Sequence, residues 1–137
     1  MVSRVAYSHE KINTFRIDGT YFFTHGFEGD DIYAALAAYY NEYEYRFEVP
    51  PEDVDEIRHL LATYEYWLVT REAYDEYVVL VDQTTPHPDD IVRESVTRTM
   101  VDDYNCFLLP TTAQVETAVA AGALPLDETS VENPFPA

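Results

Sequence analysis

Residues 30–49 change their hydrophobic period partway along, from helical spacing to the alternation of a strand. Asp30 is a residue type that caps helices. Behind it, apolar side chains recur at intervals of three and four, which predicts an amphipathic helix; they are Ile32, Ala35, Leu36, Tyr39 and Tyr40. From residue 43 to residue 49, large apolar and charged residues alternate, which predicts a strand with one solvated face. Pro50 then ends that strand.

The same order of patterns returns in the second half of the chain. An Asp-Asp-Ile sequence begins at Asp30 and again at Asp89, and a Phe-x-x-Pro sequence begins at Phe47 and again at Phe107. The spacing of the elements between these landmarks is also similar in the two copies. We therefore expect Ile32 to be equivalent to Ile91, and the chain to contain an internal duplication.

A pair of strands is expected before each copy. Residues 13–17 and 20–24 flank Asp18-Gly19, a dipeptide typical of a tight β-hairpin turn. Residues 66–69 and 77–81 form the second expected hairpin, with a longer turn between them. The run 77–81 is apolar without alternation, which predicts a central strand that is buried on both faces.

These elements predict an α+β fold made of two β-β-α-β-α units, about 12–63 and about 65–121. Because neither unit can bury its apolar face alone, we expect both to share one largely antiparallel, six-stranded sheet with four helices. The single domain would then cover residues 1–124. Residues 125–137 contain several prolines and acids, which predicts an extended Pro-rich C-terminal tail.

The net charge of the chain indicates the solvent in which the protein works. The chain carries 26 acidic residues against 8 basic ones, of which only Lys11 is a lysine, and its net charge is −18. Such a charge opposes compaction in dilute buffer, but at molar salt the Debye length falls to about 3 Å and the repulsion is screened. The composition resembles that of proteins from extreme halophiles. We therefore expect a haloarchaeon or one of its viruses as the source, and molar K⁺ as the solvent.

The acidity also bears on partners and location. Direct binding to nucleic acid is not expected, because phosphate contacts require a basic patch; an acidic mimic of nucleic acid remains an alternative. No apolar run approaches the roughly 20 residues of a membrane helix, and the first ten residues contain no apolar core of a signal peptide. The expected location is a high-salt cytoplasm or a virion. Cys106 is the only cysteine, so no internal disulfide can form.

The histidines offer only weak candidates for a metal site. Two of them precede acidic residues at expected helix starts, and the possible ligands are His25, Asp30, Asp31, His87, Asp89 and Asp90. No pair has the spacing that places two ligands on one helical face, so helix capping is the preferred interpretation. Serine, glycine and carboxylate patterns also lack a catalytic motif. We expect no cofactor and no enzymatic activity.

Tyrosine is the more informative residue type. The chain has 12 tyrosines, several of them within residues 33–45, and a domain of this size cannot bury them all. Exposed tyrosines suit protein interfaces, so Tyr39, Tyr43 and the tail residue Phe135 are the expected contact residues. The preferred function is a non-enzymatic structural or interaction module, working as an oligomer or in a larger assembly. The main alternative is a small-molecule or metal-binding protein, possibly an enzyme, with its site at the seam between the two units.

Overall fold

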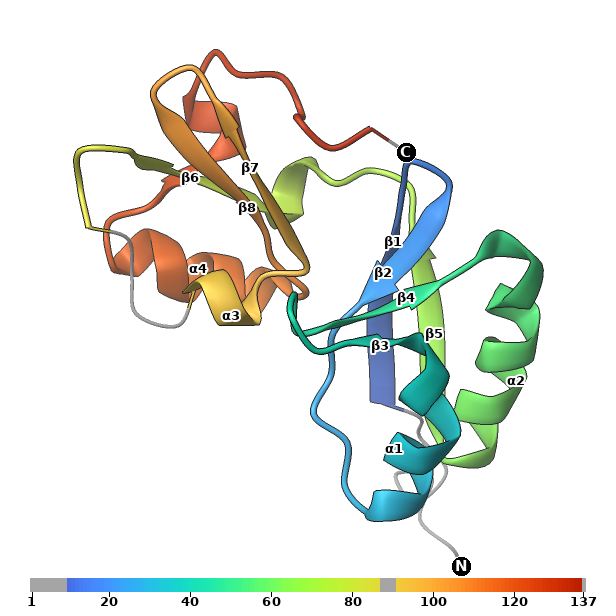
Figure 1. Ribbon diagram of the computed structural model, residues 1–137. Coiled ribbons are helices and arrows are strands. Elements are labelled where there is room, and N and C mark those ends of the chain that lie inside the picture. Colours follow the sequence, from blue (N-terminus) through green and yellow to red (C-terminus); the bar gives the residue numbers. More distant parts are fainter. Residues whose placement is uncertain (1–9, 87–90, 137) are drawn as a thin grey trace, which may run out of the picture.

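The computed structural model describes residues 10–86 and 91–136. It has an α+β fold with four α-helices and two β-sheets, one of five strands and one of four. Figure 1 shows the sheets in two adjacent halves of the molecule, with α1 and α2 beside one sheet and α3 and α4 beside the other. The α+β class and the four helices agree with the sequence, but the single six-stranded sheet does not form.

The first sheet has the strand order β3-β4-β2-β1-β5. All its pairs are antiparallel except that of β1 with β5, which is parallel. The β1–β2 hairpin turns at Asp18 and Gly19, whose φ angles of 50° and 84° are those of the turn predicted from this dipeptide. The strands are β1 (Glu10–Ile17), β2 (Thr20–Phe23), β3 (Tyr40–Asn41), β4 (Arg46–Val49) and β5 (Tyr66–Arg71).

Two helices cover one face of this sheet. α1 (Asp30–Leu36) has Gly29, rather than the predicted Asp30, as its N-cap, and α2 (Val54–Thr63) follows the predicted proline stop. Each helix turns its apolar stripe onto the sheet, as helical periodicity requires. Together they form a core whose largest contributors are Phe23, Ile32, Leu36, Phe47, Ile57 and Leu61.

The second sheet has the strand order β7-β8-β6-β9, with every pair antiparallel. Its strands are β6 (Val78–Asp82), β7 (Thr97–Val101), β8 (Tyr104–Leu108) and β9 (Leu124–Pro125). Residues 78–81 are buried, as predicted for a central strand. α3 (Ile91–Glu94) and α4 (Thr112–Ala120) contribute to the core on one face, which contains Val79, Val81, Ile91, Phe107, Leu109 and Ala118.

A third core joins the two halves, and we call it the joining core. Phe15 and Ile17 of β1 pack there with residues of the second sheet and with Leu126 and Phe135 from the C-terminal segment. The Asp18 N–H donates a hydrogen bond to the Pro136 carbonyl at 3.0 Å. The C-terminal segment therefore leaves the second half and ends against the β1–β2 turn of the first (Figure 1).

The expected hairpin of residues 66–69 with 77–81 is wrong. β5 pairs with β1 in the first sheet, and β6 pairs with β8 and β9 in the second. Between them, Tyr74 and Tyr77 place their rings against Phe15 at centroid distances of 5.4 and 5.2 Å. Because these two rings are buried in the joining core, the chain passes there from the first sheet to the second, and β5 and β6 do not pair with each other.

The second Asp-Asp-Ile sequence is followed by a strand that the repeated pattern did not predict. The third helix covers Ile91–Glu94, and the chain then forms β7, which turns through Asp102 and Asp103 into β8. Asp102 has a φ angle of 53°, a left-handed conformation that aspartate tolerates better than most residues. The residues of β7 include β-branched threonine and valine, which favour a strand.

The two sheets share part of their pairing order. β3-β4-β2 in the first matches β7-β8-β6 in the second, and in each case a helix follows the third-named strand and another follows the second-named one. Phe23 pairs with Phe47 in the first sheet, and Val79 pairs with Phe107 in the second. β1 lies between β2 and β5, whereas β6 pairs directly with β9. The shared order therefore begins at β2 and β6, rather than at the strands expected from the sequence.

Candidate functional site

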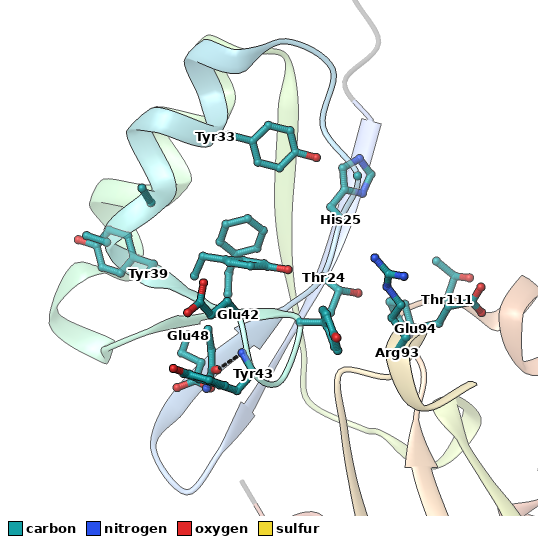
Figure 2. A pocket seen from close by; sticks show the side chains of 18 of the residues that line it. Thr24, His25, Tyr33, Tyr39, Glu42, Tyr43, Glu48, Arg93, Glu94 and Thr111 are labelled. Atoms are coloured by element: carbon teal, nitrogen blue, oxygen red, sulfur yellow. Dashed lines mark hydrogen bonds between the residues drawn. The ribbon is translucent and has the colours of Figure 1, made fainter. Parts of the chain in front are cut away.

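An open cleft of about 1370 Å³ lies between the two halves. One wall comes from the β2–α1 connection, the end of α1 and the β3–β4 hairpin. The other comes from α3 and the start of α4. Figure 2 shows Arg93, Glu94 and Thr111 across the opening from Tyr33 and Tyr43. We call this hollow the seam cleft.

Four tyrosines line the first wall and are each at least two-fifths exposed. The exposed fractions are 42% for Tyr33, 43% for Tyr40, 83% for Tyr43 and 44% for Tyr45. Tyr33 is oriented by the Phe27 N–H, which donates to its hydroxyl at 2.7 Å. The centroid of the Tyr40 ring lies 4.9 Å from that of the core residue Phe47. The wall therefore presents aromatic surface that is anchored from behind.

The turn of the β3–β4 hairpin is built by one asparagine side chain. Asn41 Oδ1 accepts hydrogen bonds from the N–H groups of Tyr43 and Glu44 at 3.0 and 3.1 Å. Asn41 Nδ2 donates to Glu48 on the opposite strand at 2.9 Å. Tyr45 has a φ angle of 57°, which is unusual for an aromatic residue. These contacts place Tyr43 at the tip and Tyr45 at the side of the cleft.

Polar contacts connect the two halves around the cleft. Arg46 donates to Glu48 at 2.8 Å and, across the seam, to the Val96 carbonyl at 3.2 Å. Arg98 forms an ion pair with Glu44 at 3.2 Å. Asn13 Nδ2 donates to the Pro110 carbonyl at 2.8 Å. These interactions link the β3–β4 hairpin and β1 to the second half, and so fix the opening of the cleft.

One cation is already in contact with the aromatic wall. The guanidinium carbon of Arg93, on α3, lies 5.2 Å from the ring centroid of Tyr45, within the range of a cation–π interaction. The neighbouring carboxylates Glu42 and Glu94 are exposed. In the described residues neither is part of an ion pair. The cleft therefore combines aromatic rings, one arginine and two carboxylates that form no ion pair in the described residues.

The predicted contact residues have three different environments. Tyr39 is half-buried, and its hydroxyl donates to Asp53 at 3.1 Å; this hydrogen bond to the carboxylate is the main cause that raises the tyrosine pKa. Tyr43 is the most exposed tyrosine of the wall. Phe135 is 4% exposed and packs in the joining core of its own chain.

The side chains considered as possible metal ligands do not come together in the part of the chain that the structure describes. His25 lies 3.5 Å from Glu10 and packs against Phe27 and Tyr66, whose rings are 4.9 and 5.2 Å from its own. Asp30 and Asp31 are exposed in the first turn of α1. His87, Asp89 and Asp90 lie outside the described residues. Within residues 10–86 and 91–136, no group of three or more His, Cys, Asp or Glu side chains is arranged to hold a metal ion.

Sequence reasoning found part of this site and missed the rest. The tyrosine cluster identified Tyr43 and its neighbours, but nothing in the sequence pointed to Arg93 or Glu94, which belong to a distant part of the chain. A smaller, mainly apolar hollow of about 470 Å³ between α2 and β5 was also missed. It is lined in part by Trp67, which is 52% exposed. The exposure of Trp67 is known only from the structure, so the sequence contained no signal for this hollow.

Comparisons of the chain with models of protein families, with curated proteins and with solved structures found no match. Among the described residues, no helix is long and apolar enough to cross a membrane.

Proposed function

We propose that the protein is a non-enzymatic interaction module and that the seam cleft is where it contacts a protein partner. The observation that carries this proposal is the wall of four exposed tyrosines facing an open cleft, of which Tyr33 and Tyr40 are anchored by contacts behind them. Tyrosine offers a large contact area at a small cost in side-chain entropy and keeps a hydroxyl for hydrogen bonding, so it is enriched at protein interfaces. This proposal places the contact surface on Tyr33, Tyr40, Tyr43 and Tyr45 and gives Tyr39 a supporting role.

The size of the cleft supports a macromolecular segment. Sites for small molecules usually enclose about 300–1,000 Å³ and bury most of the ligand, whereas the seam cleft has about 1370 Å³ and is open to solvent. An extended segment of another chain could lie along the tyrosine wall. Its main-chain and side-chain groups could then reach Thr111 and Gln114 on the opposite side.

A small-molecule site is the second candidate, because the cleft lies at the seam between the halves, where the sequence had suggested such a site. His25, Arg93, Thr111 and Gln114 supply polar groups around it. The two candidates differ in what binds. A peptide would use the whole tyrosine wall, whereas a small ligand would be held at one end of the cleft.

A selection of displayed random peptides against the full chain in molar KCl tests the proposal. We expect enriched peptides whose binding is lost in the Tyr43→Ser and Tyr40→Ser variants. The matched control is Tyr64→Ser, since Tyr64 is 37% exposed at the end of α2 and lies outside the cleft. Failure to enrich any peptide, or binders that tolerate both cleft substitutions, would contradict the proposal. Binding of small fragments in the same cleft would then favour the second candidate.

The expected duplication also becomes a proposal, with a corrected boundary. We propose that β2-α1-β3-β4-α2-β5 and β6-α3-β7-β8-α4-β9 are two copies of one unit, with β1 added to the first. The shared pairing order and the matching positions of Phe47 and Phe107, both buried beneath helices, support this. The halophilic origin and assembly into an oligomer remain part of the same proposal.

The C-terminal segment gives a test of assembly. If residues 130–137 also contact a second chain, their removal should lower the oligomeric state of the protein in molar KCl, measured as the number of chains in the native particle. The deletion begins after Leu126 and β9, because these residues pack in the fold itself. An unchanged number of chains in the native particle, or a full-length protein that is monomeric in molar KCl, would contradict the assembly hypothesis.

A further inference from the structure

We infer that the partner segment in the seam cleft is an extended, basic stretch of another protein that anchors an arginine on the tyrosine wall. The inference depends on the proposed function, because it names the chemistry of the partner at the same site. Three features of the cleft carry it: an internal arginine already stacked there, exposed carboxylates beside it, and aromatic rings with free faces.

The internal arginine shows what the wall can bind. Arg93 lies over the Tyr45 ring at 5.2 Å, and its side chain is exposed, so solvent or a ligand can replace it. Elsewhere in the chain Arg46 lies 4.2 Å from the centroid of the Phe22 ring. A planar guanidinium stacks on aromatic faces better than an ammonium group does. Arg93 therefore occupies, within the protein, a position that an arginine of a partner could take.

Further rings of the wall remain available. In the part of the chain that the structure describes, Tyr40 and Tyr43 have no cation over their rings, and Tyr43 is 83% exposed. Glu42 lies between them in sequence, and Glu94 follows Arg93 on the opposite wall. A cation placed between these walls gains both a ring and a carboxylate.

The solvent expected for this protein strengthens the role of the rings. At molar salt the Debye length is about 3 Å, so attraction between separated charges is largely screened. Contact between a guanidinium and a ring acts at van der Waals distance and is less affected. A chain of net charge −18 would attract basic partners at any distance in dilute buffer, but in molar salt selection must come from direct contact in a cleft of this kind.

An extended partner fits the shape of the cleft. Aromatic grooves commonly bind proline-rich segments in the polyproline II conformation, which is already ordered before binding and so loses little entropy. This helix has three residues per turn, so a segment with arginines three residues apart would present successive guanidinium groups to the wall from Tyr45 to Tyr40.

A set of matched synthetic peptides tests the charge. The parent is a short fluorescent peptide made of proline and alanine with two arginines. Its three relatives replace arginine by citrulline, lysine or glutamate. Citrulline keeps the shape of arginine and removes its charge. Anisotropy titrations with the full chain in molar KCl should show binding of the parent, at least tenfold weaker binding of the citrulline peptide, intermediate binding of the lysine peptide and no binding of the glutamate peptide.

Variants of the protein test the position. Arg93→Gln removes the internal competitor, so it should tighten binding of the arginine peptide about threefold or more. A misfolded protein would not gain affinity. Tyr45→Leu keeps an apolar side chain without the ring and should weaken binding at least fivefold. Tyr64→Leu is the control outside the cleft and should leave binding unchanged.

The results separate failure of this inference from failure of the proposed function. Equal binding of the citrulline and arginine peptides, preference for the glutamate peptide, or an Arg93→Gln variant that binds no more tightly would overturn the basic partner. The basic partner would also be ruled out if none of the four synthetic peptides binds while the selected library peptides still depend on Tyr43. In that case the protein would still be an interaction module, but its partner would have a different chemistry. If library peptides also fail to bind, both proposals are wrong.

Discussion

Replacing Phe135 by alanine probes how the C-terminal segment holds the two halves together. The ring is 4% exposed in the joining core, and the next residue, Pro136, accepts a hydrogen bond from the Asp18 N–H. Truncating a buried phenylalanine in the middle of a chain typically costs about 3–5 kcal/mol, because a cavity remains. Phe135 lies in a segment, residues 129–136, that belongs to no helix or strand, so here the segment can detach instead.

Detachment of the segment determines how much the substitution lowers the free energy of unfolding. Burial of a phenylalanine side chain stabilises by about 1.5–3 kcal/mol, and one hydrogen bond adds about 0.5–1.5 kcal/mol. Ordering the residues between Thr129 and Phe135 opposes this, although prolines at 134 and 136 reduce the loss. We therefore expect Phe135→Ala to lower the free energy of unfolding by about 2 kcal/mol. For a chain of this length that corresponds to a fall in Tm of about 7 °C.

Two measurements in molar KCl check this expectation. Thermal melts give the change in stability, with Met100→Ala as a control: Met100 is 65% exposed, and its truncation should cost less than about 0.5 kcal/mol. Hydrogen exchange at the Asp18 amide reports docking directly, and its protection should be lost in the variant. A stability change no larger than that of the control, with Asp18 still protected, would show that the Phe135 ring does not hold the segment in the joining core. A loss as large as that of a mid-chain phenylalanine truncation would show that the segment cannot detach on its own.

Three further measurements follow from the charge, the buried thiol and the hairpin. Melting temperature should rise steeply between dilute and molar KCl, because the charge of −18 repels itself until it is screened; a flat or falling curve would remove the basis for a halophilic origin and revive the nucleic-acid mimic. Cys106 should react with a thiol reagent only on unfolding, because burial raises the pKa of its thiol and blocks access; fast labelling of the native protein would contradict the packing of β8. Asn41→Ala should weaken peptide binding in the seam cleft about as much as Tyr43→Ser does, because Asn41 holds the turn that carries Tyr43; unchanged binding in this variant would show that the turn does not position the wall.

The elements that the sequence predicted correctly are those with local signals. The Asp18-Gly19 turn specifies the β1–β2 hairpin, and the apolar run 78–81 indicates a central strand. Thr111 is the N-cap of helix α4, and its side-chain oxygen accepts a hydrogen bond from the Gln114 N–H at 3.1 Å. In each case a few neighbouring residues contain the whole physical reason.

The pairing of β5 had no such signal. A parallel pair between β1 and β5 joins segments that are far apart in the sequence, and no turn chemistry marks it. Arg71 on β5 donates to Asn13 on β1 at 2.7 Å, and Asn13 in turn donates to Pro110 of the second half. This chain of contacts is specific, but each partner is an ordinary residue in the sequence.

The seam cleft follows from that same long-range arrangement. β1 occupies the place between β2 and β5 in the first sheet, while its Phe15 and Ile17 side chains enter the joining core. A strand that belongs to one sheet and packs against the other fixes the distance between the halves on the side of the C-terminal segment. The β3–β4 hairpin, tied across the seam by Arg46 and Arg98, fixes it again at the cleft. The tyrosine wall thus faces α3 because of long-range contacts that hydrophobic periodicity cannot predict. For this reason the sequence indicated an aromatic surface but not the arginine opposite it.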